Sequence, residues 1–156
     1  MLISGAGHGL GRELAMAFAA AGAKVIVTDR TAEGVEQTLA LVRRAGGQAA
    51  GYPLDVADNA MILDVRDRVR GEQGPLDVLV NNAGVVFGGA FLSVPVEQHH
   101  ATYRVNLRGQ VALTHAFLAD LLARPEAHLV HVASASGMIA LPYAATYASS
   151  KWGVLG

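Results

Sequence analysis

Short apolar runs alternate with longer amphipathic stretches along this chain. A short apolar or β-branched run bounded by turn residues is typical of a buried strand. A longer run with apolar residues every three or four positions is typical of a helix. The pattern predicts strands over residues 2–4, 24–28, 48–54, 76–80 and 129–133. It predicts helices over residues 12–21, 32–45, 59–70 and 96–123, and from 147 onward.

Turn and cap residues support these boundaries. Gly22 and Gly46 follow two predicted helices, where a left-handed residue is favoured, and Thr31 and Asp58 precede two others as N-caps. Strands separated by helices form βαβ units, in which the strands are parallel and helices cover both faces of the sheet. With no linker, repeat or change of composition, residues 1–156 are expected to form one doubly wound (Rossmann) α/β domain.

Composition narrows the class of protein. The chain is 52% hydrophobic and 16% charged, so it can bury a core and is not a disordered segment. Its net charge of −1 and scattered arginines provide no basic patch, so no nucleic-acid partner is expected. No stretch of about 20 residues is uniformly apolar and no signal-peptide pattern opens the chain, so we expect no membrane segment and a cytoplasmic location. The lack of cysteine excludes disulfides and thiolate chemistry, and no histidine has a carboxylate at metal-ligand spacing.

A glycine-rich turn joins the first predicted strand to the first predicted helix. Gly5, Gly9 and Gly11 lie in it at the spacing Gly-x-x-x-Gly-x-Gly. In such turns the first glycine permits the tight bend, the second lets the backbone approach a pyrophosphate, and the third allows close helix–sheet packing. The following helix N-terminus favours phosphates. His8 is placed either to contact a phosphate or to face solvent, and no Gly-Lys-Ser/Thr follows to make a nucleoside-triphosphate loop.

Asp29 ends the second predicted strand, after the glycine turn. A carboxylate there can accept hydrogen bonds from both ribose hydroxyls of an adenosine, and the alternative is an acid that caps the next turn. A 2′-phosphate about 4 Å away would be repelled by about 4 kcal/mol per pair of unit charges at an effective dielectric of about 20. Arg30 acts in the opposite direction, and the balance favours NAD over NADP.

Tyr147 and Lys151 are four positions apart in the last predicted helix and therefore lie on one face. With two lysines and four tyrosines in 156 residues, chance would give this spacing about 0.05 times. An ammonium about 4 Å from a phenol favours the phenolate by at most about 4 kcal/mol, or about three pKa units. A phenol with such a pKa can give a proton to a carbonyl oxygen or take one from an alcohol. The alternative is a surface contact between helix neighbours.

The segment Asn81-Asn82-Ala83-Gly84 follows the fourth predicted strand directly, where open α/β sheets bind ligands. Its two small residues would let a flat ring lie against the backbone. Together with the glycine turn and Tyr147-x-x-x-Lys151, this segment resembles the motifs of the short-chain dehydrogenase/reductase family, in order and over essentially the whole chain. The segment from His131 to Gly137 and the Tyr-Ala-Ser-Ser-Lys helix start also resemble the retinol and 17β-hydroxysteroid dehydrogenase branch.

The resemblance implies an NAD(P)-dependent oxidoreductase that interconverts an alcohol and a ketone or aldehyde. Tyr147 matches the family's catalytic acid/base, and Lys151 matches the residue that lowers the tyrosine pKa and holds the nicotinamide ribose. Ser134, 13 positions before Tyr147, matches the serine that hydrogen-bonds the reacting oxygen, whereas Ser136 breaks that interval. Asn106 matches the asparagine whose backbone holds a water in the proton relay.

The resemblance also implies a cofactor site, with NAD as the expected cofactor. It places Asn82 and Gly84 under the adenosine and ribose, and Asp55 at the adenine amino group. From the residues alone, Asp55 is a strand-end cap and Asn106 a solvated helix asparagine. The expected cofactor-binding residues are Gly5, His8, Gly9, Leu10, Gly11, Asp29, Arg30, Asp55, Val56, Asn82, Ala83, Gly84, Tyr147 and Lys151.

Two other functions fit parts of the pattern. An S-adenosylmethionine-dependent methyltransferase also uses a glycine-rich loop and an acid ending the second strand, but it gives Tyr147 and Lys151 no role. A non-catalytic dinucleotide sensor could share the fold. The apolar stretch Met138–Ala145 indicates a hydrophobic alcohol or carbonyl substrate. The resemblance implies homodimers or homotetramers, paired through helices around residues 100–120 and from 147.

Family members continue well beyond the position of Gly156, to roughly 250 residues. We therefore expect a longer protein that supplies further strands and the substrate loop, with strand 129–133 left as an unprotected edge here. The isolated 156-residue chain is expected to be poorly soluble and nearly inactive. Five apolar residues of the long helix are placed for packing in the core, with packing against a partner as the alternative; they are Val105, Val111, Phe117, Leu118 and Leu121.

Overall fold

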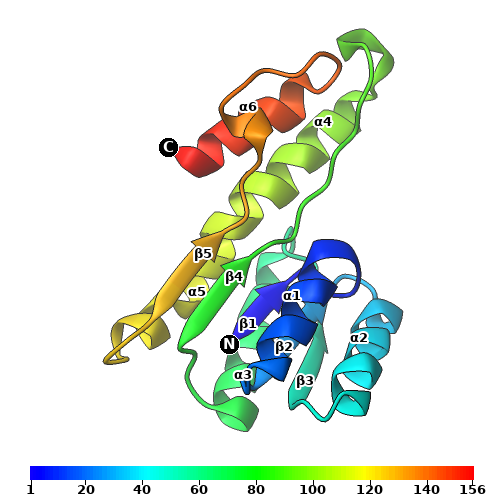
Figure 1. Cartoon of the computed structure of the whole chain (residues 1–156). Helices are drawn as coiled ribbons and strands as arrows, with labels where there is room; N and C mark the ends of the chain where they lie inside the picture. The colour runs from blue at the N-terminus through cyan, green and yellow to red at the C-terminus, as the bar shows by residue number, and fades with distance from the viewer.

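Five parallel strands form one sheet in the computed structural model, which describes residues 1–156 (Figure 1). The strands are β1 (Leu2–Ser4), β2 (Val25–Asp29), β3 (Ala49–Pro53), β4 (Val78–Asn81) and β5 (His128–His131). The α-helices are α1 (Gly9–Ala20), α2 (Ala32–Arg44), α3 (Asn59–Gln73), α4 (Val96–Tyr103), α5 (Gln110–Leu122) and α6 (Ala145–Leu155). Two 3₁₀ turns, η1 (Phe91–Ser93) and η3 (Ala135–Gly137), and one π-helical turn, η2 (Arg104–Gly109), complete the elements.

The strand order β3-β2-β1-β4-β5 places the first strand in the middle of the sheet. The chain runs outward from β1 to β3, then crosses to the other side of β1 to form β4 and β5. The predicted doubly wound α/β fold is thereby confirmed. Ligands of such sheets bind outside the carboxyl ends of the strands where the order reverses, which here is the gap between β1 and β4.

Alternate strand residues face two separate cores. Leu2 and Ile26 pack with α3 and α5 on one face, whereas Ile3 and Val27 pack with α1 and α2 on the other. β1 and β2 are buried along their whole length, as the unbroken apolar runs predict. β5 forms one edge of the sheet and all four of its residues are exposed, in agreement with the expected unprotected edge.

Several boundaries differ from the prediction by one to three residues. α1 begins at Gly9 rather than Arg12, so its first turn includes the last two glycines of the glycine turn. α2 begins after Thr31 as predicted, with the Thr31 side chain accepting a hydrogen bond from the Gly34 N–H. α3 follows the predicted cap Asp58, whose carboxylate accepts from two N–H groups, and it runs three residues past Arg70.

The predicted long helix over 96–123 is helical throughout, but the π turn η2 interrupts it. Gly109 is the last residue of this turn, and there is no room for a side chain at this position, because a Cβ atom would lie 2.8 Å from the Val56 carbonyl oxygen. Phe117 and Leu121 lie in the core, and Val105 packs against it. Core burial is wrong for Val111 and Leu118, which are 63% and 39% exposed, and packing against a partner stays a prediction for both.

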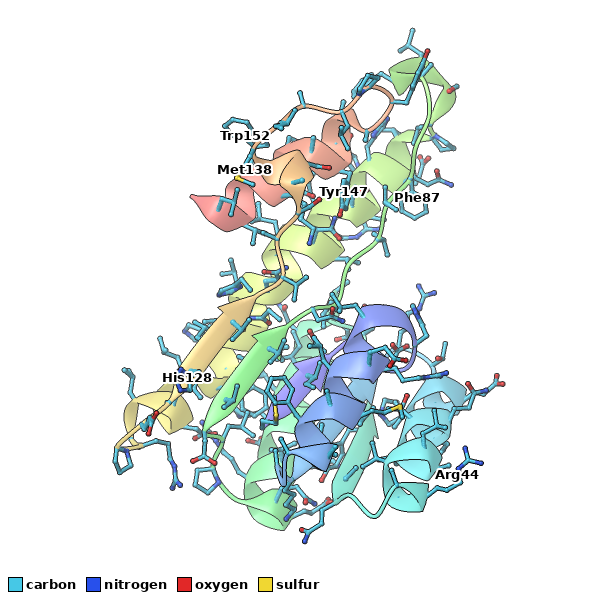
Figure 2. The ribbon with its side chains drawn as sticks, viewed as in Figure 1. Arg44, Phe87, His128, Met138, Tyr147 and Trp152 are labelled. Atoms are coloured by element: carbon cyan, nitrogen blue, oxygen red, sulfur yellow. The ribbon has the colours of Figure 1, made fainter.

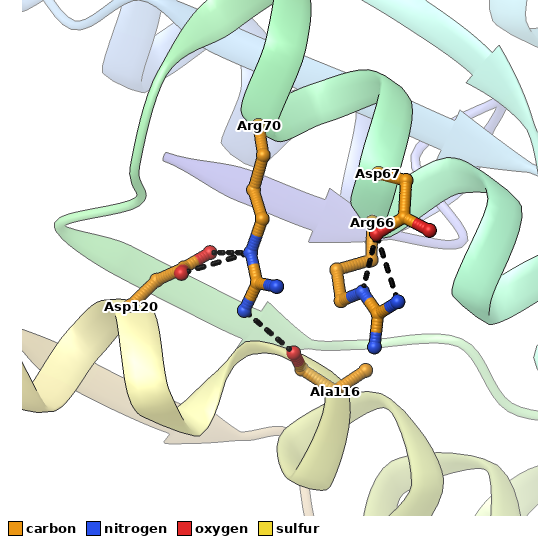
Figure 3. A network of polar contacts seen from close by, with 5 residues as sticks. All are labelled: Arg66, Asp67, Arg70, Ala116 and Asp120. Atoms are coloured by element: carbon orange, nitrogen blue, oxygen red, sulfur yellow. Dashed lines mark hydrogen bonds and ion pairs between the residues drawn. The ribbon is translucent and has the colours of Figure 1, made fainter.

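An ion pair joins α3 to α5 on the face of the sheet that these two helices cover (Figure 3). The Arg70 Nε donates to both carboxylate oxygens of Asp120, at 2.9 and 3.0 Å, and its Nη2 donates to the Ala116 carbonyl oxygen at 3.4 Å. Arg66 pairs instead with its neighbour Asp67 at 2.8 Å. The contacts of Arg70 therefore hold the second half of the long helix against α3.

α4, α6 and the segments that follow β4 and β5 make up an outer part beyond the carboxyl end of the sheet (Figure 1). None of the helices combines the length and the apolar character needed to cross a lipid bilayer.

Candidate active site

A cavity of about 350 Å³ opens at the carboxyl ends of β1, β2 and β4. Eleven of the fourteen expected cofactor-binding residues line it: Gly5, His8, Leu10, Gly11, Asp29, Arg30, Asp55, Val56, Asn82, Ala83 and Gly84. Thr31, Leu54, Val85 and Val105 complete the lining, and sequence reasoning missed them because they belong to no motif. Gly9, Tyr147 and Lys151 are not part of the lining.

A larger cavity of about 660 Å³ lies between α3 and the long helix. It is lined mainly by apolar side chains, such as Leu63, Leu107 and Val111, and Val56 is the one expected site residue that it contains. Size therefore does not identify the active site, and the convergence of the motifs at the smaller cavity does.

The glycine turn depends on close backbone approaches. Gly5 and Gly9 have φ values of +65° and +54°, in the left-handed region that favours glycine. A Cβ on Gly5 would lie 2.8 Å from the Ala83 Cα, and one on Gly11 would lie 2.5 Å from the Asn82 Nδ2. His8 precedes the helix without a side-chain cap, so the N–H groups of the first turn of α1 keep no side-chain partner there. The turn thus fits an anion such as a pyrophosphate.

Asn82 fastens β4 to this turn. Its Nδ2 donates to the carbonyl oxygens of Ser4 and Gly5, at 2.9 and 3.0 Å. The Ser4 hydroxyl in turn accepts from the N–H groups of Asn82 and Ala83, at 3.0 and 3.1 Å. The side chain of Asn82 therefore shapes the cavity wall, while Ala83 and Gly84 leave the wall free of bulky side chains.

The two expected acids each bind a neighbouring turn and also face the cavity. One carboxylate oxygen of Asp29 accepts from the Gly7 N–H at 3.0 Å, and the other accepts from the Thr31 N–H and hydroxyl, at 3.2 and 3.3 Å. Asp55 accepts from the Ala57 N–H at 2.9 Å. The capping alternative and the ligand-binding prediction are thus compatible for both acids. Arg30 is exposed beside Asp29 at the cavity.

α6 places Tyr147 and Lys151 on one face, as the spacing predicts. The Lys151 side chain is buried, and its Nζ donates to the Val132 carbonyl oxygen at 2.8 Å. The Nζ lies 5.9 Å from the centre of the Tyr147 ring, and a Cβ on Gly84 would lie 3.8 Å from it. No carboxylate pairs with this ammonium, and its burial lowers the pKa of Lys151. Figure 2 shows Tyr147 between α6 and α4, beyond the strand ends.

Asn106 connects the long helix to the cavity wall and to α6. It is fully buried in the π turn, where its Oδ1 accepts from the Val85 N–H at 2.8 Å and its Nδ2 donates to the Val85 carbonyl oxygen at 2.9 Å. The same Nδ2 donates to the Ser150 hydroxyl at 3.1 Å, and that hydroxyl donates to the Tyr147 carbonyl oxygen at 2.7 Å. The alternative of a solvated helix asparagine is wrong, because the π turn directs this side chain inward. Ser150 was missed, although it lies within the tyrosine–lysine motif.

Two further polar contacts join α4 to α6. The Tyr103 hydroxyl lies 2.6 Å from the Ser149 Oγ, and the Nδ1 of His99 bonds the Thr146 hydroxyl next to Tyr147. His99, Tyr103 and Asn106, which follow one another at intervals of four and three residues, therefore contact three different residues of α6. These contacts between helices could not be predicted from the sequence, because they depend on how the two helices pack.

The serine pair after β5 divides into two environments. Ser134 is half-buried, and its Oγ accepts from the Ser136 N–H at 3.1 Å at the start of η3. Ser136 is buried. η3 packs on α6 so closely that a Cβ on Gly137 would lie 2.7 Å from the Lys151 carbonyl oxygen. The choice of Ser134 over Ser136 stays a prediction.

The whole chain is similar to proteins of known family. The pattern of the short chain dehydrogenase family matches residues 1–156. The chain is 36% identical to estradiol 17-beta-dehydrogenase 11 of Mus musculus over 156 residues, which is 100% of this chain and 52% of that protein. It is also 36% identical to epidermal retinol dehydrogenase 2 of Homo sapiens over 157 residues, covering 51% of that protein. The chain thus spans about half the length of these relatives.

Solved structures give the same result. A variant of actinorhodin polyketide ketoreductase with NADPH is 36% identical and superposes with a TM-score of 0.95, over 99% of this chain and 60% of that one. A short-chain dehydrogenase/reductase from Burkholderia phymatum in complex with NAD is 30% identical, with a TM-score of 0.93 over 99% of this chain and 55% of that one. The motifs, the cavity and these matches agree, and the chain belongs to the short-chain dehydrogenase family of NAD(P)-binding oxidoreductases.

Proposed function

We propose that the complete protein interconverts a hydrophobic alcohol and its ketone or aldehyde, with NAD as cofactor and Tyr147 as the proton donor and acceptor. The observation that carries this proposal is the pair on α6. A buried ammonium without a carboxylate partner lies one helical turn from Tyr147 and next to Gly84 at the cavity wall. Buried charges are held in proteins at a cost, so a lysine kept in this environment supports a functional role.

The residues around the smaller cavity fit a dinucleotide. The glycine turn offers a helix N-terminus without a side-chain cap, and Asp29 lies at the end of β2, where an adenosine ribose would bind. Ala83 and Gly84 would contact the adenosine and ribose, and Lys151 would hold the second ribose. When bound, the nicotinamide supplies or accepts the hydride.

The protein's own residues would handle the proton. Tyr147 would donate its hydroxyl proton to the carbonyl oxygen in reduction and take it back in oxidation. Ser134 would orient that oxygen by a hydrogen bond. The Lys151 ammonium would favour the phenolate left after proton donation, and Asn106 would continue the relay towards solvent.

The preference for NAD over NADP rests on the negative charge of Asp29 at the cavity. One of the related structures contains NAD and another contains NADPH, so the relatives do not distinguish between the two cofactors. The names of the sequence relatives support a hydrophobic alcohol of the steroid or retinol type as substrate. The exposed apolar residues Met138, Ile139 and Leu141, in the segment after η3, support the same class.

The deciding experiment compares Tyr147→Phe with Tyr52→Phe in the complete protein. Turnover of a panel of hydrophobic alcohols and ketones is followed by the absorbance of reduced nicotinamide, and NAD binding is measured separately by calorimetry. Tyr147→Phe should abolish turnover and leave NAD binding nearly unchanged. Tyr52, whose hydroxyl bonds Glu72 of α3 and which lines neither of the two cavities, provides a matched control that should keep its activity. Retained turnover in Tyr147→Phe would refute the mechanism, and wild-type protein that binds NAD without any turnover would support a sensor instead.

A further inference from the structure

We propose that Arg12 and Thr38 are positioning residues for dinucleotide binding. Together they hold the carbonyl groups of Ala6 and Gly7 away from the cavity, so that neither carbonyl oxygen is directed at a bound pyrophosphate. The proposal rests on the proposed function, because it concerns the same cofactor site. Neither residue lines the cavity, and neither belongs to the glycine motif.

The contacts form a connected set between α1, α2 and the turn. Thr38 is fully buried in α2, and its Oγ1 donates to the Ala6 carbonyl oxygen at 2.9 Å and accepts from the Arg12 Nε at 3.0 Å. The Nη2 of Arg12 donates to the Gly7 carbonyl oxygen and, at 3.0 Å, to the Gln37 side-chain oxygen. Two side chains therefore satisfy two consecutive carbonyl groups of the turn.

α2 is built to approach the turn closely enough for these bonds. Gly34 lies one helical turn before Thr38, and a Cβ there would lie 3.1 Å from the Gly7 Cα. On the other side, the Gly7 N–H donates to the Asp29 carboxylate. The Ala6–Gly7 peptide group is thus fixed in orientation by α2 and β2, and the Gly7 carbonyl group is fixed by Arg12 of α1.

This fixation matters because the turn itself has little rigidity. Gly5, Gly7 and Gly9 alternate within five residues, and glycine adopts more backbone conformations than any other residue. A peptide group that rotates would turn its carbonyl oxygen towards the phosphates, and the oxygen and the phosphates would repel each other. The guanidinium of Arg12 also adds a positive charge behind the turn. Holding the turn in its binding conformation before the ligand arrives increases affinity.

The test compares ligands with and without the pyrophosphate. Dissociation constants for NAD, ADP-ribose and adenosine are measured by calorimetry or competition on the complete protein, with Thr38→Val, Arg12→Met and Arg12→Lys. We expect Thr38→Val and Arg12→Met to weaken NAD and ADP-ribose at least tenfold and adenosine less than twofold. Arg12→Lys keeps the charge but cannot reach three acceptors at once, so it should give a smaller loss of the same kind.

Two controls separate positioning from general damage. Thr38→Ser keeps the hydroxyl and should restore ADP-ribose affinity to within twofold of the wild type. Arg44→Met removes an arginine from the far end of α2 and should change none of the constants (Figure 2). Melting temperatures are recorded for every variant, and Arg12→Lys provides the decisive comparison if Thr38→Val does not fold.

The possible failures are distinguishable. If wild-type protein binds neither NAD nor ADP-ribose, the proposed function fails and the positioning role fails with it. If wild-type protein binds both but the variants bind ADP-ribose with unchanged affinity, the positioning role alone is overturned. It is also overturned if adenosine weakens as much as ADP-ribose, because the effect would then not involve the phosphates.

Discussion

Replacing Lys151 with methionine tests the central electrostatic argument. Methionine keeps a long unbranched side chain in the buried space between α6 and Val132, but it removes the ammonium. Taking the 5.9 Å from the Nζ to the Tyr147 ring centre as the charge separation, an effective dielectric of about 20 gives about 3 kcal/mol of attraction to a phenolate. This energy corresponds to about a 100-fold lower kcat. Loss of the contact to the nicotinamide ribose should raise the KM for NAD in addition.

The same substitution should also change how the free energy of unfolding depends on pH. Burial lowers the pKa of Lys151, so the folded state releases this proton before the unfolded state as pH rises. The wild type therefore gains stability with increasing pH in the window between the lowered folded pKa and the ordinary value of 10.5. Lys151→Met lacks this gain, so the free energy of unfolding of the wild type should rise relative to the variant from pH 7 to pH 10.

Steady-state kinetics by nicotinamide absorbance and urea unfolding at several pH values measure the two effects. A kcat within threefold of the wild type would refute the electrostatic argument. A difference in unfolding free energy that does not change with pH would show that Lys151 is not held in a desolvated environment. Lys24→Met, at an exposed position before β2, provides the matched control for loss of a lysine.

Three further substitutions test the cavity and the long helix. Asp29→Asn keeps the shape of the side chain and removes its charge, so the ratio of the KM for NADP to that for NAD should fall at least tenfold; an unchanged ratio would refute the proposed basis of cofactor choice. Asn106→Ala leaves three hydrogen bonds unmade in a buried site and should lower the unfolding free energy by about 3 kcal/mol, measured with urea; a loss below about 1 kcal/mol would contradict the buried network. Gly109→Ala should destabilise, because its Cβ would lie 2.8 Å from the Val56 carbonyl oxygen, whereas Gly71→Ala in the open should stabilise by about 0.5–1 kcal/mol. Equal effects of the two glycine substitutions on the melting temperature would refute the crowding at η2.

The order of the elements and the positions of the motifs follow from local patterns in the amino-acid sequence. Apolar runs that are buried on both sides, such as Val25–Asp29, have a pattern that depends only on local composition, so they could be recognised one at a time. The same holds for Thr31 and Asp58, because an N-cap acts on groups two or three residues away. The tyrosine–lysine pair shares a face because four residues make about one turn of a helix.

Which motifs meet, and which contacts hold them together, depends on the folded arrangement of the whole chain. Asn82 bonds residues 77 and 78 positions away, and Asn106 reaches Ser150 through a π turn that no local pattern in the sequence indicates. The choice between a solvated and a buried Asn106 depends on where the long helix lies against α6. Contacts of this kind join elements from distant parts of the chain, and their geometry exists only when the sheet and its two helical layers are assembled.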